Sequence, residues 1–274
     1  MAFKNIGQTC FINASLQCLL HLDAVNDLIV QPMAVSSPEQ SLYNEYVALR
    51  DLARGNRIIT PTRFVAFVRH VAAFLKVDQF QSTAQCDASE FIRFMVRCLN
   101  TAMKHDRPIP EPAFAQHFKN DYSDLIPLLY GVQDTMIDGK SVAQEPFFFL
   151  ELPIPDRPDV TLLDCLQLYT SPEAIDQREK RTAITRFPPI LFISLVRFNA
   201  RGLKNNAHVQ VPESLTLEAR AYTLKYVCNH MGGVGGGHYT ASVRTSQWFL
   251  VDDDTVCPTP RPTQNAYYMV YVSS

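Results

Sequence analysis

Asn5-Ile-Gly-Gln-Thr-Cys10-Phe-Ile-Asn13-Ala-Ser-Leu-Gln17 is the most informative stretch of this chain of 274 residues. Apolar residues at positions 12, 16, 19 and 20 follow helical spacing, so a helix is predicted to begin at or near Cys10. The N–H groups and macrodipole at a helix N-terminus stabilise a thiolate, and a neighbouring imidazolium lowers the pKa of a thiol further. Cys10 is therefore predicted to be reactive. The commoner role of a cysteine is that of an inert core residue, and this is expected of Cys18, Cys98, Cys165 and Cys257.

A histidine and an aspartate, each in its own motif, complete a candidate triad. His238 stands in Gly237-His238-Tyr239, and Asp252 follows the apolar run from Trp248 to Val251. In a triad the thiolate attacks, an imidazole takes its proton, and a carboxylate fixes the imidazole tautomer. A hairpin between the strand after His238 and the strand before Asp252 would bring the two side chains together. Asp253 and Asp254 are rival partners that residue order alone does not exclude.

Two further features fit a hydrolytic site. The side-chain amide of Asn5, together with the Cys10 backbone N–H, could form an oxyanion hole, in which one such donor contributes about 3–4 kcal/mol. The alternative for Asn5 is an ordinary turn asparagine. Ahead of His238 lies a glycine-rich stretch that is expected to form a mobile loop over a substrate tail, with glycines at Gly232, Gly233, Gly235, Gly236 and Gly237.

Composition excludes several classes of protein. A net charge of -2 gives no basic face for nucleic acid or membrane surfaces, and no apolar stretch is long enough to span a membrane. The seven cysteines are odd in number and form no C-x-x-C pair, which argues against a disulfide framework and against a four-cysteine zinc site. Cys228 and His230 would share a strand face, but no second pair accompanies them. We expect no metal or cofactor, and an intracellular protein of the cytoplasm or nucleus, since no apolar signal region follows Met1.

The chain divides into a helical half and a β-rich half. Helices are predicted from about Thr9, near 40 to 54 with Gly55 as C-cap, after the N-cap Thr60 with Pro61 at the first helical position, and from close to Asp87. Strands are predicted where apolar residues alternate: 147 to 154, 190 to 198, 222 to 229, 238 to 244, 248 to 251 and 266 to 272. Cys10 then lies in the helical lobe and His238 and Asp252 in the β-rich lobe, so we expect catalysis in the cleft between them.

Three segments together resemble the catalytic domain of the ubiquitin-specific proteases, which are papain-like cysteine deubiquitinases. The segment from Asn5 to Leu20 resembles the cysteine box of that family. A second segment resembles its glutamine-aspartate box, and a third its histidine box. These are Gln85-Cys-Asp87-Ala-Ser-Glu90-Phe91, and Tyr222 through Val272 with His230, Gly232, Gly237-His238-Tyr239, Trp248, Asp252-Asp253 and Ala266-Tyr267.

The resemblance implies an α+β, papain-like fold and a set of roles. It implies one catalytic domain over 1–274, with a helical thumb over about 1–125 and a β-rich palm with a reduced fingers subdomain over about 126–274. Ubiquitin or ubiquitinated proteins would be the partners of a monomeric enzyme. Cys10, His238, Asp252 and Asn5 would be catalytic, with Asp253 as a secondary candidate. Contact with the ubiquitin tail would fall to Gln85, Asp87, Glu90 and Tyr239, where acids suit arginines of the tail.

The chain also departs from the family pattern. Gln8, Phe11 and Cys86 stand where the family usually has Asn, Tyr and a second Gln. The two C-x-x-C pairs that commonly bind zinc in the fingers are absent, so a short, zinc-free fingers region is expected. Two alternatives stay open: a protease for another ubiquitin-like modifier, and a catalytically weak ubiquitin-binding pseudo-enzyme. Without the resemblance, Asp87 would be taken for a helix N-cap and Glu90 for a solvated helical residue.

Overall fold

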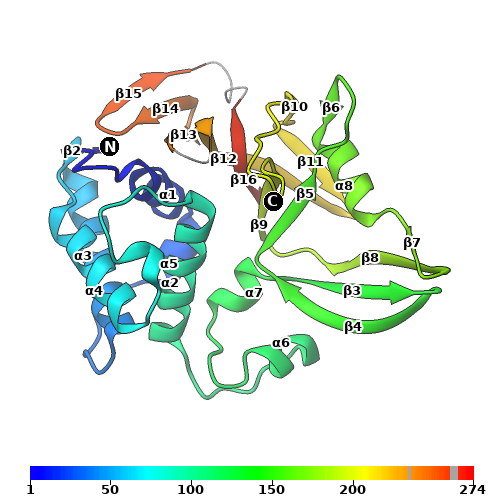
Figure 1. Cartoon of the computed structure of the whole chain (residues 1–274). Helices are drawn as coiled ribbons and strands as arrows, with labels where there is room; N and C mark the ends of the chain where they lie inside the picture. Colours follow the sequence, from blue (N-terminus) through cyan, green and yellow to red (C-terminus); the bar gives the residue numbers. More distant parts are fainter. Residues whose placement is uncertain (234–235, 260–264) are drawn as a thin grey trace.

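The computed structural model describes residues 1–233, 236–259 and 265–274. Helices gather on one side of the molecule and strands on the other, and one small sheet projects away from both (Figure 1). The change from mainly helices to mainly strands occurs at Gly131. The α+β class is confirmed.

The helices fall mainly in the first half of the chain. They are α1 (Cys10–Leu20), α2 (Asp23–Leu28), α3 (Pro38–Gly55), α4 (Thr62–Phe74), η1 (Asp78–Phe80, a 3-10 turn), α5 (Ala88–Met103), α6 (Pro112–His117), α7 (Leu125–Leu129) and α8 (Leu162–Thr170). The predicted helices correspond to α1, α3, α4 and α5. The shorter helices α2, α6, α7 and α8 had not been predicted.

Two of the predicted helix ends are wrong by one residue. Gly55 is the last residue of α3, and the C-cap is Asn56, whose extended backbone has φ -124° and needs no glycine. Pro61, not Thr60, is the N-cap of α4, because the Pro61 carbonyl accepts the first helical bond from the Val65 N–H at 2.9 Å. No side-chain hydrogen bond caps this helix.

Helix α1 is buried along almost its whole length, from Cys10 to Leu19. Such a helix belongs to the core rather than to a surface layer. Two hydrogen bonds fix it to its neighbours: the Tyr226 hydroxyl donates to the Ala14 carbonyl at 2.8 Å, and the Ser15 hydroxyl donates to the Ala88 carbonyl at 3.2 Å. The nucleophile candidate therefore begins a helix that is held from both lobes.

A large sheet, mostly antiparallel, forms the second half of the core. Its strand order is β15-β14-β13-β12-β16-β9-β5, with β11 paired to the first residues of β12 and with β5 and β9 parallel. The strands are β5 (Phe149–Pro153), β9 (Ile190–Val196), β11 (Ser214–Leu217), β12 (Arg220–Gly233), β13 (Gly236–Arg244), β14 (Trp248–Asp252), β15 (Thr255–Pro258) and β16 (Ala266–Ser273). All the predicted strands lie in this sheet, and α1 packs against β13.

The small sheet occupies the place of the expected fingers. It has the order β4-β3-β8-β7, formed by the hairpins β3 (Gly131–Ile137) to β4 (Lys140–Phe147) and β7 (Glu173–Ile175) to β8 (Arg178–Arg186). Each hairpin has a two-residue turn, Asp138-Gly139 and Asp176-Gln177. All four residues have the positive φ angles that are typical of such turns. Sequence analysis had not predicted these strands.

The tips of the two hairpins are joined by one aspartate. The Asp138 carboxylate accepts the Arg178 Nε–H at 2.8 Å and the Glu179 backbone N–H at 3.0 Å, and the Asp138 N–H donates to the Glu179 carbonyl at 2.8 Å. Neither hairpin contains a cysteine or histidine. The residues present therefore do not fit a zinc site, and polar contacts hold the tips together.

Two short parallel pairs complete the fold: β1 (Ala2–Phe3) with β2 (Ile58–Ile59), and β6 (Val160–Thr161) with β10 (Val209–Gln210). In the part of the chain that the structure describes, no helix has both the length and the apolar character needed to cross a membrane.

Candidate active site

A cleft of about 900 Å³ lies between the start of α1, the segment before α5 and the strand β13. It brings together residues that are far apart in the sequence. Its lining includes the predicted residues Asn5, Cys10, Gln85, Asp87, Gly233, Gly236, Gly237, His238 and Tyr239, and also Gln8, Ala84, Cys86, Phe198 and His230. Of the predicted site residues that the structure describes, Glu90, Gly232, Asp252 and Asp253 do not line this cleft.

Cys10 is the first residue of α1, as predicted, and only 3% of it is exposed. The pKa of its thiol is raised, whereas the sequence predicted a lowered pKa. Burial raises the pKa of the thiol above its ordinary value, and the Asp253 carboxylate raises it further. Hydrogen bonds from the Tyr239 backbone N–H and the Gln85 amide act in the opposite direction without cancelling the burial. The expected lowering by a helix terminus and an imidazolium is therefore not seen in this state.

His238 and Asp252 form the predicted pair. Strands β13 and β14 are antiparallel, with Ala241 opposite Val251, so continuing this register places His238 diagonally across from Asp252 on the same face. The His238 Nε2 atom lies 2.6 Å from Asp252 Oδ1. The other ring nitrogen, Nδ1, is then the one left to exchange a proton with a nucleophile.

Asp253 accepts hydrogen bonds from residues on the N-terminal side of the site rather than from His238. Its carboxylate accepts the Asn5 Nδ2–H at 2.9 Å and the Asn13 Nδ2–H at 2.8 Å, and its carbonyl accepts the Phe3 N–H at 3.0 Å. A φ of 48° at Asp253 turns the chain so that consecutive carboxylates point to different partners. The structure therefore separates the rivals: Asp252 contacts His238, and Asp253 contacts Asn5.

The orientation of the Asn5 amide is fixed from both ends. Its Oδ1 atom accepts the backbone N–H groups of Gly7 at 3.1 Å and Thr9 at 3.2 Å, while Nδ2 donates to Asp253. One N–H of Nδ2 is used in this way, and the second has no partner among the described residues. An N–H group held in such a way at the rim of the cleft can donate to a developing oxyanion.

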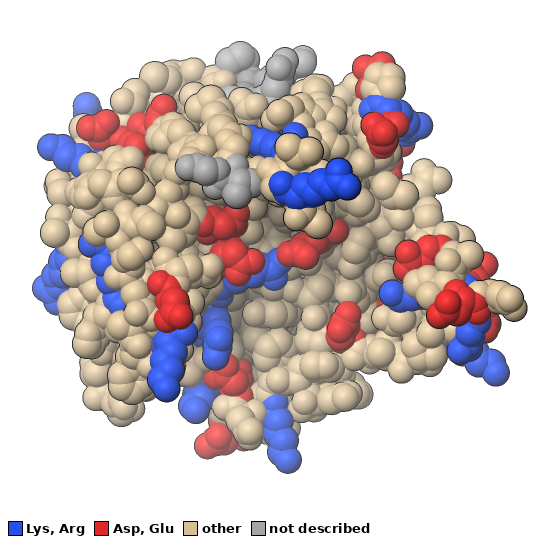
Figure 2. Space-filling view, in the orientation of Figure 1, with Lys and Arg blue, Asp and Glu red and all other residues tan. Residues whose placement is uncertain are grey.

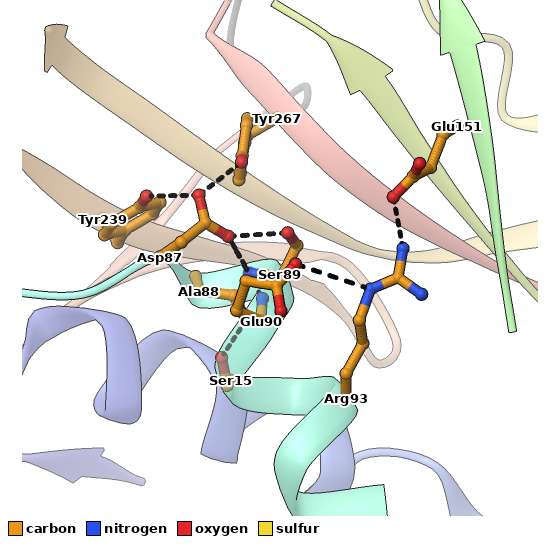
Figure 3. A network of polar contacts seen from close by, with 9 residues as sticks. All are labelled: Ser15, Asp87, Ala88, Ser89, Glu90, Arg93, Glu151, Tyr239 and Tyr267. Carbon is orange, nitrogen blue, oxygen red and sulfur yellow. Dashed lines mark hydrogen bonds and ion pairs between the residues drawn. The ribbon is translucent and has the colours of Figure 1, made fainter. Parts of the chain in front are cut away.

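Asp87 is the N-cap of α5, and both oxygens of its carboxylate accept hydrogen bonds. Oδ1 accepts the N–H groups of Ser89 at 2.7 Å and Glu90 at 3.1 Å, while Oδ2 accepts the hydroxyls of Tyr239 at 3.4 Å and of Tyr267 (Figure 3). Tyr239 lines the cleft and is only 5% exposed. The helix-cap interpretation of Asp87 is thus correct, whatever else this residue does.

Glu90 lines a second hollow, of about 870 Å³, between α5 and the strands β4 and β5. Arg93, one turn further along α5, forms an ion pair with Glu151 on β5 and lies 4.0 Å from Glu90 (Figure 3). Figure 2 shows acidic side chains along this hollow with a basic one between them. The side chains of Glu90 and Glu151 are 51% and 61% exposed, so both are accessible to a basic ligand.

The glycines before His238 lie at the end of a hairpin. Gly232 pairs with Gly237 and Gly233 with Gly236, and Gly235 lies outside the described residues. A Cβ at Gly237 would come within 2.2 Å of His230 Nε2 and 2.7 Å of the Met231 carbonyl, so only glycine fits there. The predicted mobile loop thus begins and ends in paired backbone, and its mobility stays a prediction.

The candidate metal ligands do not indicate a separate metal centre. Among the described residues, the side chains of His238, Asp252 and Asp253 are the group of three whose ligand atoms lie within 4.8 Å of one another. Each of the three already has a hydrogen-bond partner: His238 pairs with Asp252, and Asp253 accepts bonds from Asn5 and Asn13. Cys228 and His230 belong to no such group.

Several residues in or beside the two hollows were given no functional role from the sequence. Gln8, Arg93 and Glu151 line a hollow, while Asn13 bonds to Asp253 and Tyr267 to Asp87. Arg93 carried a usable signal, because it is three residues from Glu90 on the same helix. Tyr267 belongs to the segment that resembles the histidine box, but its bond to Asp87 is a tertiary contact, as are the contacts of Gln8, Asn13 and Glu151.

The chain is similar to known proteins of one family. The model of the family "Ubiquitin carboxyl-terminal hydrolase" matches residues 1–271. Ubiquitin carboxyl-terminal hydrolase 2 of Rattus norvegicus is 29% identical over 332 aligned positions, which cover 98% of this chain and 53% of that protein. Ubiquitin carboxyl-terminal hydrolase 21 of Homo sapiens is 25% identical, over 94% of this chain and 58% of that protein. The chain therefore spans about half the length of the relatives it matches.

The fold is similar to that of solved deubiquitinating modules. A SAGA module of Ubp8, Sgf11, Sus1 and Sgf73 bound to monoubiquitin contains a chain that matches with a TM-score of 0.79 and 21% identity, over 100% of this chain and 69% of that one. The module bound to ubiquitin aldehyde matches with a TM-score of 0.75 and 20% identity, over 100% of this chain and 69% of that one. At this level of identity the likeness concerns the fold.

Proposed function

Because the chain belongs to the ubiquitin carboxyl-terminal hydrolase family, we propose that it is a thiol-dependent deubiquitinase that cleaves the bond after the C-terminal glycine of ubiquitin. The observation that carries the proposal is the cleft that both Cys10 and His238 line, with Asp252 at 2.6 Å from the imidazole. One catalytic domain over 1–274, with a thumb over about 1–125 and a palm with reduced fingers over about 126–274, would carry the activity.

The chemistry follows from these three side chains. His238 takes the proton of the Cys10 thiol, and the sulfur attacks the carbonyl carbon of the terminal glycine. The C–N bond breaks, the leaving amine takes the proton from His238, and a thioester remains on Cys10. Water, deprotonated by His238, then hydrolyses the thioester, which releases the carboxylate and the thiol. Asp252 keeps the imidazole in the tautomer that this sequence needs.

Asn5 would stabilise the tetrahedral intermediates. Its amide orientation is fixed by Gly7, Thr9 and Asp253, which leaves one N–H at the rim of the cleft. Because a donor held in advance needs no reorganisation during the reaction, it stabilises the transition state more than the bound substrate. Asp253 then acts through Asn5 as a positioning residue.

Recognition of a basic tail would depend more on Glu90 than on Asp87. The carboxylate of Asp87 already accepts bonds from two backbone N–H groups and two tyrosine hydroxyls. Glu90 is half-exposed and faces a hollow that also contains Glu151. In this proposal Asp87 and Tyr239 shape the floor beneath the tail, while Glu90 contacts a basic side chain of ubiquitin.

The proposal is tested with a fluorogenic ubiquitin C-terminal amide and a panel of probes derived from other modifiers that end in Gly-Gly. Wild-type protein is expected to turn over the ubiquitin substrate, while Cys10→Ala and His238→Ala should not. Faster turnover of another modifier would assign the protein to that modifier. Binding of ubiquitin without turnover would make it a pseudo-enzyme.

A further inference from the structure

Gln85 spans the cleft beside the nucleophile. It lies in the segment before α5, where its own N–H donates to Gln8 Oε1 at 2.8 Å. Its side-chain amide pairs with the backbone of Gly237 from both ends: Oε1 accepts the Gly237 N–H at 3.0 Å, and Nε2 donates to the Gly237 carbonyl. A side-chain amide that pairs in this way replaces a neighbouring strand for one residue of β13.

The same amide reaches the reacting atom. Gln85 Nε2 lies 3.5 Å from Cys10 Sγ, within the range of a hydrogen bond to sulfur. Gly237 directly precedes His238 in the chain. One side chain from the helical lobe thus contacts both the candidate nucleophile and the backbone that carries the candidate base.

We propose that Gln85 is a further residue of the catalytic centre, where it donates a hydrogen bond to the Cys10 sulfur and holds the strand of His238 in place beside it. This inference rests on the proposed thiol hydrolysis. It gives Gln85 a part in the chemistry, in addition to the contact with a substrate tail that its motif implies. Because both N–H groups of Nε2 have partners in the free protein, the amide is committed to these contacts before substrate binds.

The expected consequence concerns the protonation of Cys10. An N–H donor stabilises a thiolate more than a thiol, so the Gln85 amide opposes the burial that raises the pKa of Cys10. The Tyr239 backbone N–H acts in the same direction, whereas Asp253 raises the pKa. The titratable groups that share the cleft with Cys10 or interact with it are His238, His230, Tyr239, Asp87, Asp253, Cys86 and Cys228.

Two variants test the proposal. Gln85→Met removes the donor and the pairing with Gly237, while Gln85→Glu keeps the shape and the acceptor for the Gly237 N–H but turns a negative charge toward the sulfur. The first readout is the rate at which iodoacetamide alkylates Cys10 as a function of pH, followed by mass spectrometry of the Cys10 peptide. The second is the pH profile of kcat and KM on the ubiquitin amide.

We expect the alkylation midpoint to rise by about one to two pH units in Gln85→Met, the amount that corresponds to one hydrogen bond to a charged group. Gln85→Glu should shift it at least as far. The kcat value at neutral pH should fall by about 10- to 100-fold with little change in KM. Gln81→Met, which alters an exposed amide bonded to Asp78 in the same segment, should leave both readouts unchanged.

A rise in KM at constant kcat, with an unmoved alkylation midpoint, would overturn the proposal and leave Gln85 with a tail contact alone. The alkylation assay does not need ubiquitin, so a wild-type protein without turnover would contradict the proposed function and not this inference. If Gln85→Met fails to fold by circular dichroism, the shape-preserving Gln85→Glu variant carries the same test.

Discussion

Asp253 offers a prediction that distinguishes two adjacent carboxylates by their partners. Asp253→Asn keeps the shape of the side chain but removes its charge and one of its two acceptor oxygens. The carboxylate now accepts one N–H from Asn5 at 2.9 Å and one from Asn13 at 2.8 Å. After the change, one of the two asparagines faces an NH₂ group instead of an oxygen.

The magnitude follows from these two bonds. A hydrogen bond to a charged group contributes about 1.5–3 kcal/mol, and a neutral one about 0.5–1.5 kcal/mol. Loss of the charge therefore weakens the hold on the Asn5 amide, and the oxyanion donor moves from its position. Since a complete loss of such a donor costs about 10²–10³ in kcat, a displaced one should cost about 10- to 100-fold, with KM nearly unchanged.

The assay compares steady-state kinetics of Asp253→Asn with those of two neighbours. Asp252→Asn should lose about 10²–10⁴-fold because the His238 tautomer is no longer fixed. Asp254→Asn, at an exposed position, should stay within about twofold of wild type.

A double-mutant cycle with Asn5→Ala gives the sharper test. If Asp253 acts through Asn5, the double variant Asn5→Ala with Asp253→Asn should be no slower than Asn5→Ala alone. Fully additive losses, or a larger defect at Asp254 than at Asp252, would refute this reasoning.

Three further predictions concern pH, metal and substrate recognition. Burial lowers the pKa of His230 from 6.5 to about 4, so the unfolded chain takes up this proton first. The free energy of unfolding should fall by about 3 kcal/mol from this side chain as the pH drops from 6.5 to 4, and an equal pH dependence of urea unfolding in His230→Asn would contradict it. The purified protein should contain no stoichiometric zinc, and a chelator should leave activity and Tm unchanged, whereas about one zinc per chain by elemental analysis would count against this. Glu90→Arg should lower kcat/KM on ubiquitin by more than the roughly 10- to 150-fold of one lost charge-assisted bond, and Glu218→Arg, in the exposed β11–β12 turn, should not. Full activity of Glu90→Arg would leave it a solvated helical residue.

Periodic and local signals in the sequence were sufficient for much of the fold. The apolar spacing after Cys10 predicted α1, and Asp87 predicted the start of α5 because an aspartate accepts the free N–H groups of a helix N-terminus. The alternating runs predicted β12, β13, β14 and β16, whose inner faces are buried in the core.

The strands of the small sheet were missed for a physical reason. Strands β4 and β7 are almost entirely exposed, so their residues show no alternation between apolar and polar faces. Their turns use Asp138-Gly139 and Asp176-Gln177, and the second pair has no glycine to mark a hairpin.

At the site, the pairing of His238 with Asp252 was predictable, whereas the protonation of Cys10 and the partners of Asp253 and Gln85 were not. Sequence order placed Cys10, His238 and Asp252 in separate motifs, but the raised pKa of Cys10 comes from burial between two lobes. Asp252 and Asp253 bond to different partners because the backbone at Asp253 is left-handed. The hydrogen bond between Gln85 and Gly237 joins residues that are 152 positions apart, so no local pattern could predict it.

The central claim is that Cys10 is the nucleophile that attacks the ubiquitin terminus. The most direct measurement is the intact mass of the protein after reaction with a ubiquitin C-terminal electrophile, followed by mapping of the modified peptide. We predict one ubiquitin adduct per chain, attached at Cys10, and no adduct in Cys10→Ala. An adduct on another cysteine, or an unchanged yield in Cys10→Ala, would contradict the account.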